Sequence, residues 1–415
     1  MKITHAFALA LALSIASAPA AWARHALAAP LCAAIRHSLD AAGDGSRSPA
    51  FLASYLPGPN ESDVPLPLRQ SAFTYDNSLA AIALIACGDV QRARRIGNAL
   101  LIAGEHDRSF GDGRLRNAYR AGLVSGDSSI ALPGWWDAKQ KMWAEDAYQD
   151  GTATGNVAWA ALALLNLYEA TQEEAYRAGA ARLLHWITAN TLDQRAPVGF
   201  SGGVDGFDNL QTKLTWRSTE HNIDVYALAV WLDRLDANSA HENVVAIARG
   251  FLDSVFVPDQ GLFRLGTKPD GALQPTNYLA LDTQLWPLLA VSDAPAAWRQ
   301  AMHGAEIKLS VPGGFDFNND RDGLWVEGTA QAALTLRSLG RERDAAALLD
   351  ALASQISPSG YLFATREKRI TTGLKIGPNS SEADLFYYRL PHLGATAWAV
   401  LAATQWNPFT GKIVG

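Results

Sequence analysis

The chain has 415 residues, of which 48% are hydrophobic and 18% are charged, and its net charge is −6. A charged fraction below the roughly 25% of an average soluble domain argues against a disordered chain, and no block rich in Lys or Arg points to nucleic acid as a partner. Tryptophan is frequent, with 13 residues beside 14 Phe and 3 Met, and such large flat side chains serve either as core or as stacking surfaces.

The first residues have the pattern of a secretory signal peptide. Lys2 gives a basic start, residues 6–21 are mostly apolar, and Ala21-Trp22-Ala23 fits the small-x-small cleavage pattern, with an alternative cut after Ala29. The apolar run is too short to span a membrane, although an uncleaved N-terminal anchor remains an alternative. We therefore expect a signal peptide over residues 1–23 and a periplasmic or secreted mature chain, with no membrane insertion after cleavage.

The sequence predicts neither a metal nor a cofactor. Cys32 and Cys87 are the only cysteines, and their spacing does not decide between one disulfide and two buried free thiols. The nine histidines form no H-E-x-x-H motif and no close cluster. No phosphate loop or dinucleotide fingerprint is present.

Downstream of the signal, the chain repeats a pattern of two helices. In each repeat, a loop leads into a helix of Ala, Leu and Trp that is apolar on most faces, and a short turn leads into an amphipathic helix. The first kind is expected over residues 78–86, 157–168, 223–235, 284–291, 330–339 and 395–406, and the second over 90–103, 173–187, 241–256, 294–309 and 343–356. Pro287 is expected to shorten or kink the fourth helix of the first kind.

The sixth apolar helix has no partner after it, but residues 30–43 form a lone predicted helix at the other end of the chain. Such a pattern indicates a closed ring, because an open solenoid needs polar capping repeats. We expect one all-α domain over residues 30–410, an (α/α)6 toroid of six helical hairpins whose N-terminal helix pairs with the last inner helix. The longest connection, residues 104–150, is typical of a functional wall or lid.

Acidic residues stand at the starts of alternate apolar helices. Asp76 begins the first, Glu220 and Asp224 begin the third, and Glu327 begins the fifth. Because inner helices of a toroid run in one direction, these carboxyl groups are expected to converge over a central pocket. Taken singly, each acid could be only a favourable charge in a first helical turn.

Two facing carboxyl groups, one protonated and one ionised, can cleave a glycosidic bond. Non-adjacent inner helices could hold them about 6.5–9.5 Å apart, as inverting enzymes require. We expect Glu327 and Glu220 to be the acid/base pair, with Asp76 and Asp224 orienting sugar hydroxyls or the attacking water. Burial beside aromatic side chains is expected to raise the pKa of such an acid.

The loops are rich in aromatic residues, on which sugar rings stack through their apolar C–H faces. The expected substrate-binding residues are Trp135, Trp136, Trp216, His221, Tyr226, Trp325, Tyr388, Arg389 and His392. Some loop aromatics could instead plug the end of the barrel. The tryptophans inside predicted helices are expected to be core: Trp159, Trp186, Trp231 and Trp398.

Three motifs resemble the six-hairpin glycosidase superfamily, which includes inverting glycoside hydrolases with (α/α)6 toroids. They are Tyr75-Asp76-Asn77, residues 220–226 (EHNIDVY) and residues 327–331 (EGTAQ). The resemblance covers nearly the whole mature chain at the level of the hairpin pattern and points to no single family. It implies an acid and a base at inner-helix starts, without saying which carboxyl takes which role.

The expected function is that of an exported, monomeric glycoside hydrolase whose partner is a polysaccharide or oligosaccharide. A polysaccharide lyase is the first alternative, because Tyr388 and His392 could act as bases on an acidic glycan that Arg389 neutralises. A non-catalytic glycan-binding protein of an exopolysaccharide system is the second, since it would need the aromatics but not the carboxylates.

Two further motifs carry less weight. Residues 199–203 match G-x-S-x-G, but loop-like residues follow where a nucleophile elbow needs a helix. Asn318, Asp320 and Asp322 imitate the start of a calcium loop whose twelfth position is Thr329 instead of Glu. A turn rich in Asp and Asn is the simpler interpretation of that segment.

Overall fold

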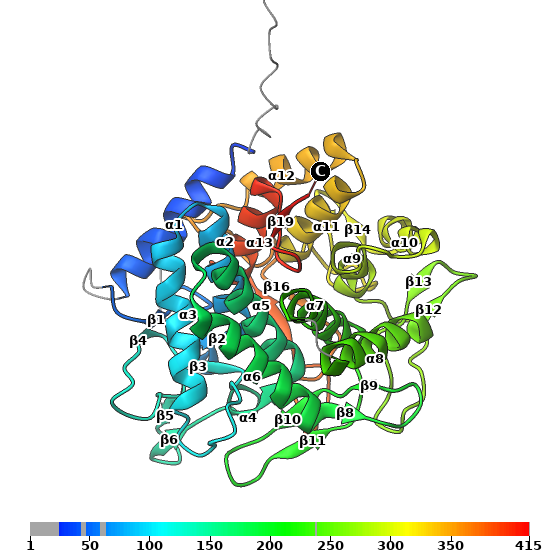
Figure 1. Cartoon of the computed structure of the whole chain (residues 1–415). Helices are drawn as coiled ribbons and strands as arrows, with labels where there is room; N and C mark the ends of the chain where they lie inside the picture. Colours follow the sequence, from blue (N-terminus) through cyan, green and yellow to red (C-terminus); the bar gives the residue numbers. More distant parts are fainter. Residues whose placement is uncertain (1–24, 43–46, 59–63, 237–238, 415) are drawn as a thin grey trace, which may run out of the picture.

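The computed structural model describes residues 25–42, 47–58, 64–236 and 239–414, and the predicted signal peptide lies outside these ranges. Six helices form a closed inner ring (Figure 1). They are α2 (Thr74–Ala86), α5 (Thr154–Thr171), α7 (Thr219–Leu235), α9 (Leu281–Ala290), α11 (Val326–Ser338) and α13 (Leu393–Thr404). Each packs against the next, and α13 packs against both α11 and α2, which closes the ring.

A second layer of helices surrounds the ring. It consists of α3 (Val90–Glu105), α6 (Glu174–Thr191), α8 (Ser239–Val255), α10 (Gln300–Lys308) and α12 (Glu342–Ala353), each packed on the inner helix before it. The N-terminal helix α1 (Ala28–Ala41) packs on α13, the last inner helix. The predicted (α/α)6 toroid is confirmed, including the pairing of the two chain ends. No helix within the described ranges combines the length and apolarity that crossing a membrane requires.

Short strands and turns fill the connections between the helices. Antiparallel pairs are β1 (Ala50–Phe51) with β4 (Gly122–Leu123), β2 (Ser71–Phe73) with β3 (Ala118–Arg120), β5 (Trp135–Asp137) with β6 (Met142–Ala144), β8 (Leu192–Asp193) with β9 (Gly199–Phe200), β12 (Phe256–Val257) with β13 (Leu262–Phe263), β14 (Ser310–Val311) with β15 (Gly314–Phe315), β16 (Arg369–Thr371) with β17 (Phe386–Tyr388), and β18 (Trp406–Asn407) with β19 (Lys412–Ile413). A three-stranded sheet joins β7 (Thr152–Ala153), β10 (Gly203–Asp205) and β11 (Thr212–Leu214), and the remaining short helices are η2 (Leu66–Leu68), α4 (Ala147–Asp150) and η3 (Ala296–Arg299). The long 104–150 connection therefore holds β3 to β6 and α4.

The inner helices begin earlier than the hydrophobic pattern predicts. Thr74 starts α2 and Thr219 starts α7, so Asp76 and Glu220 lie inside the first helical turn and not in the preceding loop. The polar residues of the motifs are thus held by regular backbone. As expected from its proline, α9 is short, with Pro287 in its last turn.

Tryptophans fill the centre of the ring. The rings of Trp159, Trp286 and Trp398 lie 5.3 to 5.9 Å apart and pack with Phe409. They come from α5, α9 and α13, which are alternate helices of the ring. The four helical tryptophans predicted to be core are all buried.

A disulfide ties the outer layer to the inner ring. Cys32 of α1 and Cys87, the residue that ends α2, are bonded across 55 positions of sequence. Arg36 of α1 adds an ion pair to Asp89 at the same place. The pairing holds α1 where it completes the outer layer between the first and last hairpins.

Replacing both cysteines by serine is expected to lower the free energy of unfolding by about 2–4 kcal/mol, because the unfolded chain regains the freedom of a long loop. Urea denaturation under oxidising conditions measures the difference. Reductant should destabilise the native protein to the same extent and leave the double variant unchanged. Equal stability of the two proteins without reductant would contradict the disulfide.

Candidate active site

Five carboxyl groups converge at the end of the ring where the inner helices begin. Asp76, Glu220, Asp224 and Glu327 are those predicted from the sequence, and Asp282 of α9 joins them. Their mutual charge effects show the proximity. Burial is the largest cause that raises the pKa of Glu220, Asp224 and Glu327, and nearby negative charges raise each pKa further. These charges are Asp282 and Glu327 for Glu220, Glu220 and Asp282 for Asp224, and Asp76 and Asp282 for Glu327.

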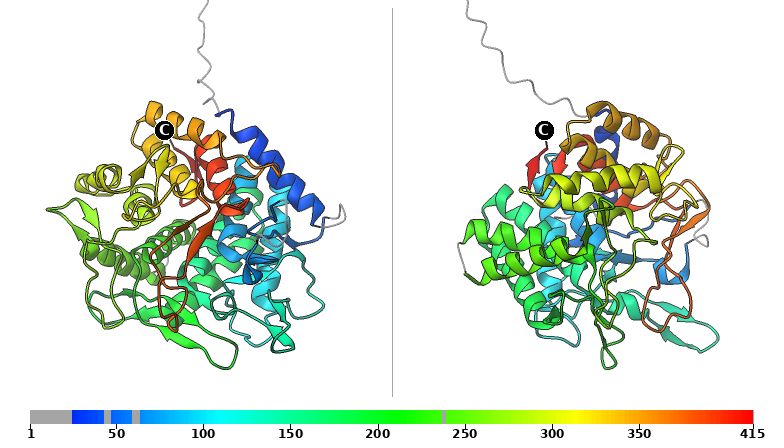
Figure 2. Two further views of the ribbon diagram at one scale, coloured as in Figure 1. Left: turned by 180° about the vertical axis from the view of Figure 1, so that it is seen from behind. Right: turned by 90° about the vertical axis from the view of Figure 1, so that its right-hand side faces the viewer.

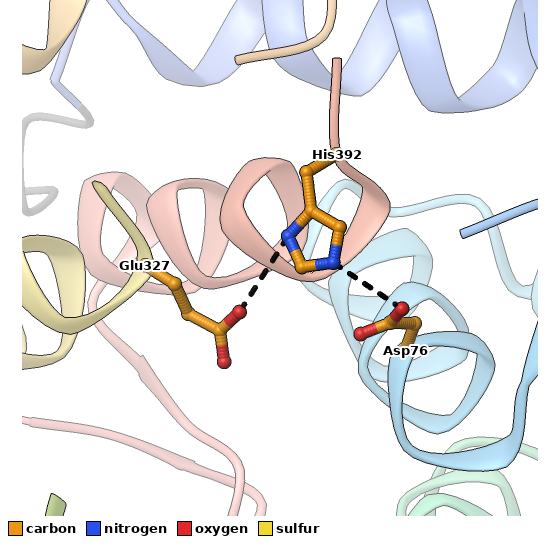
Figure 3. A group of neighbouring side chains, drawn as sticks. All are labelled: Asp76, Glu327 and His392. Carbon is orange, nitrogen blue, oxygen red and sulfur yellow. Dashed lines mark ion pairs between the residues drawn. The ribbon is translucent and has the colours of Figure 1, made fainter. Parts of the chain in front are cut away.

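His392 lies between two of these acids (Figure 3). Its Nε2 is 3.4 Å from Oδ2 of Asp76, and its Nδ1 is 3.7 Å from Oε2 of Glu327. Asp76 lies on α2, Glu327 lies on α11, and His392 is the N-cap residue of α13. All three side chains are buried. Burial lowers the pKa of His392, but Asp76 and Glu327 outweigh it and the net shift is upward.

One hydrogen bond of His392 indicates which form of its ring caps α13. Its Nδ1 accepts the backbone N–H of Ala395 at 3.2 Å and so caps α13. An acceptor at Nδ1 carries no proton, so the capping form is the neutral ring with its proton on Nε2, facing Asp76. Protonation of Nδ1 would exchange this cap for an ion pair with Glu327.

Glu327 is held by a chain of hydrogen bonds that begins in the tryptophan core. The indole N–H of Trp398 donates to the Tyr75 hydroxyl at 2.8 Å, and the hydroxyl donates to Oε1 of Glu327 at 2.7 Å. Because Tyr75 already accepts from Trp398, its own proton is directed to Glu327. Oε2 of Glu327 has no hydrogen-bond partner among the described residues. Burial raises the pKa of Glu327 to about 7.

A second chain reaches Glu327 from the other side. Trp286 donates to Oε1 of Gln331 at 3.0 Å, and Nε2 of Gln331 lies 3.5 Å from Oε1 of Glu327. The aromatic core therefore orients the carboxyl group from two helices. Glu327 is positioned by residues whose own side chains are fixed by packing.

Helix α7 contributes Glu220, His221 and Asp224. Glu220 is half-buried, whereas the other four carboxyl groups of the cluster are buried. Burial lowers the pKa of His221 to about 4, so its ring is neutral near pH 7. Gly155 of α5 admits this arrangement, since a Cβ there would lie 2.5 Å from Cδ2 of His221.

Asp224 is buried beneath Glu220. Neither carboxyl oxygen accepts a hydrogen bond of normal geometry from a described residue, although Trp159 is near enough to lower its pKa. Burial and the charges of Glu220 and Asp282 outweigh this effect of Trp159, so the pKa of Asp224 is raised well above its usual value. Burial of this kind disfavours the charged form of the acid, and the protonated form can donate a hydrogen bond.

Four of the aromatic residues predicted to bind substrate are half-buried or exposed. Trp216, whose ring lies 5.5 Å from that of His221, is half-buried at this end, as is Tyr388 of β17. Trp135 and Trp136 lie on β5.

Three predicted residues make their described contacts with other parts of the protein. Trp325 is only 2% exposed and packs on Phe317 and Tyr387. Tyr226 is buried and feels the charges of Asp293 and Arg249 toward the outer layer. The exposed Arg389 stacks on Phe363 and donates to the carbonyl of Arg366. The roles of these three residues in substrate binding stay predictions.

Three residues of the cluster were not among those predicted. Asp282 is the second residue of α9, as Glu220 is of α7 and Glu327 is of α11, so the repeat itself contained this signal. Tyr75 lies in a recognised motif but was assigned no role. Tyr387 lies near the acids on the β16–β17 pair, which runs across this end of the ring (Figure 2, left). No local sequence pattern predicts that the chain takes this path.

The two minor motifs are accounted for by turns. Ser201 lies between β9 and β10 with no helix after it, so it is not a nucleophile elbow. Carboxyl oxygens of Asp316, Asp320 and Asp322 lie within 4.8 Å of one another. However, Oδ1 of Asn318 accepts the N–H of Asp320 and Oδ1 of Asp320 accepts that of Asp322, which favours the turn interpretation.

No protein-family model matches the sequence, and no curated protein is detectably similar to it. Solved structures are similar in fold. A glycosidase shares 15% identity over 90% of this chain and 96% of its own, with a TM-score of 0.59. A family 76 α-mannanase from Bacteroides thetaiotaomicron shares 11% over 90% and 94%, with a TM-score of 0.57. A sugar epimerase from a ruminal bacterium shares 13% over 90% and 98%, with a TM-score of 0.58. The resemblance to six-hairpin glycosidases is thus confirmed for the fold.

Proposed function

We propose that the protein is an exported glycoside hydrolase that cleaves a neutral polysaccharide or oligosaccharide with two carboxyl groups. The observation that carries the proposal is Glu327, a buried acid with a pKa of about 7 that Tyr75 orients, grouped with the half-exposed Glu220. Solved glycosidases of the same fold support it, one of them in a complex with glucose. The signal-peptide pattern and the disulfide support export.

In the proposed reaction, Glu327 is the acid. Its proton passes to the glycosidic oxygen as the bond to the anomeric carbon breaks, and a water molecule attacks that carbon. Glu220 takes the proton of the water, because it is the carboxyl of the cluster that is half-exposed. Asp76 and Asp224 orient hydroxyl groups or the water, and the product has inverted configuration.

The charge of the site supports a neutral substrate over the acidic glycan of a lyase. No Lys or Arg in the described ranges forms an ion pair with any of the five carboxyl groups. Arg389, the cation expected to neutralise a uronate, bonds elsewhere. A uronate would therefore meet clustered acids without a compensating guanidinium, which is unfavourable in a buried site.

Substrate entry requires a local movement. Glu327 is 1% exposed. Beside Glu327, the ring of Tyr387 packs on Trp325 and on His392. Tyr387 is itself half-buried, so a sugar can reach its ring from outside. We propose that substrate displaces this tyrosine to reach Oε2 of Glu327.

Product analysis tests the proposal. The full-length mature protein is incubated with α-mannan, a soluble β-glucan and a polyuronate, and products are followed by reducing-end assay, ultraviolet absorbance and proton NMR of the new anomeric centre. New reducing ends from a neutral glycan, first formed with inverted configuration, are expected. An unsaturated product would indicate a lyase, an epimer without cleavage would indicate an isomerase, and binding without product would indicate a glycan-binding protein.

The pH profile should report Glu327. Since the acid must be protonated, kcat/KM is expected to fall as pH rises above about 7, the pKa of Glu327. The hydrogen bond from Tyr75 lowers that pKa, so Tyr75→Phe should move the alkaline limb to higher pH. Initial rates across pH 5–9 on roughly half-unit steps measure the limb. An unchanged limb in this variant would show that another group controls it.

A further inference from the structure

Two tryptophans are exposed on the β5–β6 pair, away from the carboxyl cluster. Trp136 is 61% exposed and Trp143 is 45% exposed. They are direct cross-strand partners, so both project from the same face of the pair. Figure 1 shows β5 and β6 at the rim of the molecule. Tryptophan in a soluble protein is usually well buried, and adjacent exposed aromatics mark binding surfaces.

Trp143 is held in place from two sides. Its indole lies against Gly134, where a Cβ would be only 2.4 Å from Nε1. The guanidinium of Arg120 lies 5.2 Å from the ring centroid. The ring therefore loses little conformational freedom when a ligand stacks on it, which favours binding.

The aromatic pair is linked to the carboxyl cluster through Arg120 and the β2–β3 pair. Arg120 belongs to β3, which pairs with β2, and β2 leads directly into α2 and Asp76. Around the tryptophans the hairpin tip is polar, with Lys139, Gln140 and Lys141 exposed. Flat apolar rings bordered by hydrogen-bonding side chains match the two faces of a sugar, its C–H side and its hydroxyls.

We propose that Trp136 and Trp143 form a stacking platform for a glycan chain that extends beyond the carboxyl cluster. The inference rests on the proposed function and deepens it, because a remote platform benefits only a polymer long enough to reach both places. The substrate class is then a neutral polysaccharide and not a short oligosaccharide. Binding energy gained at the platform raises the local concentration of the chain at the carboxyls.

Binding is tested in the inactive Glu327→Gln background, so that it does not depend on turnover. Trp136→Ala, Trp143→Ala and the double variant are run in native gels containing soluble α-mannan or β-glucan. The double variant is expected to bind the retarding polymer about 10-fold more weakly. Ile307→Ala is the matched control, since Ile307 is equally exposed but lies on α10. In the active protein, KM for the polymer should rise relative to KM for a trisaccharide.

The outcomes separate the platform from the proposed function. Hydrolysis of a glycan with equal retardation of all variants would overturn the platform alone. Lost retardation in the double variant without hydrolysis by the native protein would support the platform and overturn the hydrolase. The platform is also overturned if neither polymer retards the Glu327→Gln protein, or if light scattering shows that the tryptophans instead hold two copies of the chain together.

Discussion

Glu327→Gln is expected to lower kcat by about 10²–10⁴-fold, the usual contribution of a general acid. The amide cannot supply a proton to the glycosidic oxygen. It can still accept the Tyr75 hydroxyl through its own oxygen, so the positioning contact at Oε1 survives. The loss should be smaller on an aryl glycoside with an acidic leaving group, because such a bond breaks without protonation. Steady-state rates on the glycan and on the aryl glycoside give the two ratios.

A Glu→Gln substitution at an exposed position is the control. Glu174→Gln removes an exposed carboxylate whose one ion pair among the described residues is with Arg177, three residues along α6, and surface pairs contribute about 0–1 kcal/mol. Its kcat should equal that of the native protein. Circular dichroism and thermal denaturation should show that Glu327→Gln is folded. A folded Glu327→Gln protein with native kcat would remove Glu327 from the reaction.

The fold could be predicted because a closed ring requires an apolar inner helix in every hairpin. Inner helices such as α2, α11 and α13 are buried on nearly all faces, and a helix surrounded by others needs an apolar sequence throughout. The unpaired helices at the two ends of the chain then have one natural partner, each other, and α1 packs on α13.

The carboxyl cluster was predicted in part for the same reason. Glu220 and Glu327 are the second residues of their helices and Asp76 is the third residue of α2, and parallel inner helices bring these first turns to one place. Asp282 obeys the same rule and could have been found by it. The proximity of the acids thus follows from helix register and ring geometry.

The surroundings of the cluster depend on loops that carry no such register. Trp325 and Tyr387 are both loop or strand aromatics near the acids, yet one is buried as a plug and the other is half-exposed. Which of them meets the sugar depends on the path of β17 across the barrel end. Likewise, the hydrogen bond from Tyr75 depends on the rotamers of Tyr75 and Glu327, which sequence spacing does not specify.

Gly394→Ala is expected to reduce kcat by about 10²-fold or more, the cost of misplacing catalytic groups by about 1 Å. Gly394 lies in the first turn of α13, beside the Asp76–His392–Glu327 group. A Cβ there would stand 2.6 Å from Oδ1 of Asp76, 2.8 Å from Oε2 of Glu327 and 3.0 Å from Cε1 of His392. These side chains are buried, so at least one carboxyl must rotate away. Initial rates at saturating glycan measure the effect.

Gly250→Ala separates this steric effect from the general consequence of removing a helical glycine. Gly250 is exposed within α8, and a Cβ there would meet nothing within 4 Å. Alanine is the better helix former by about 0.5–1 kcal/mol, so this variant should be more stable and fully active. Gly394→Ala gains the same helix propensity, yet it should lose activity because the added methyl group enters the space that the two carboxyls share. A folded Gly394→Ala protein with native kcat would mean that catalysis does not depend on the observed arrangement of Asp76 and Glu327, and the acid would have to be sought among Glu220, Asp224 and Asp282.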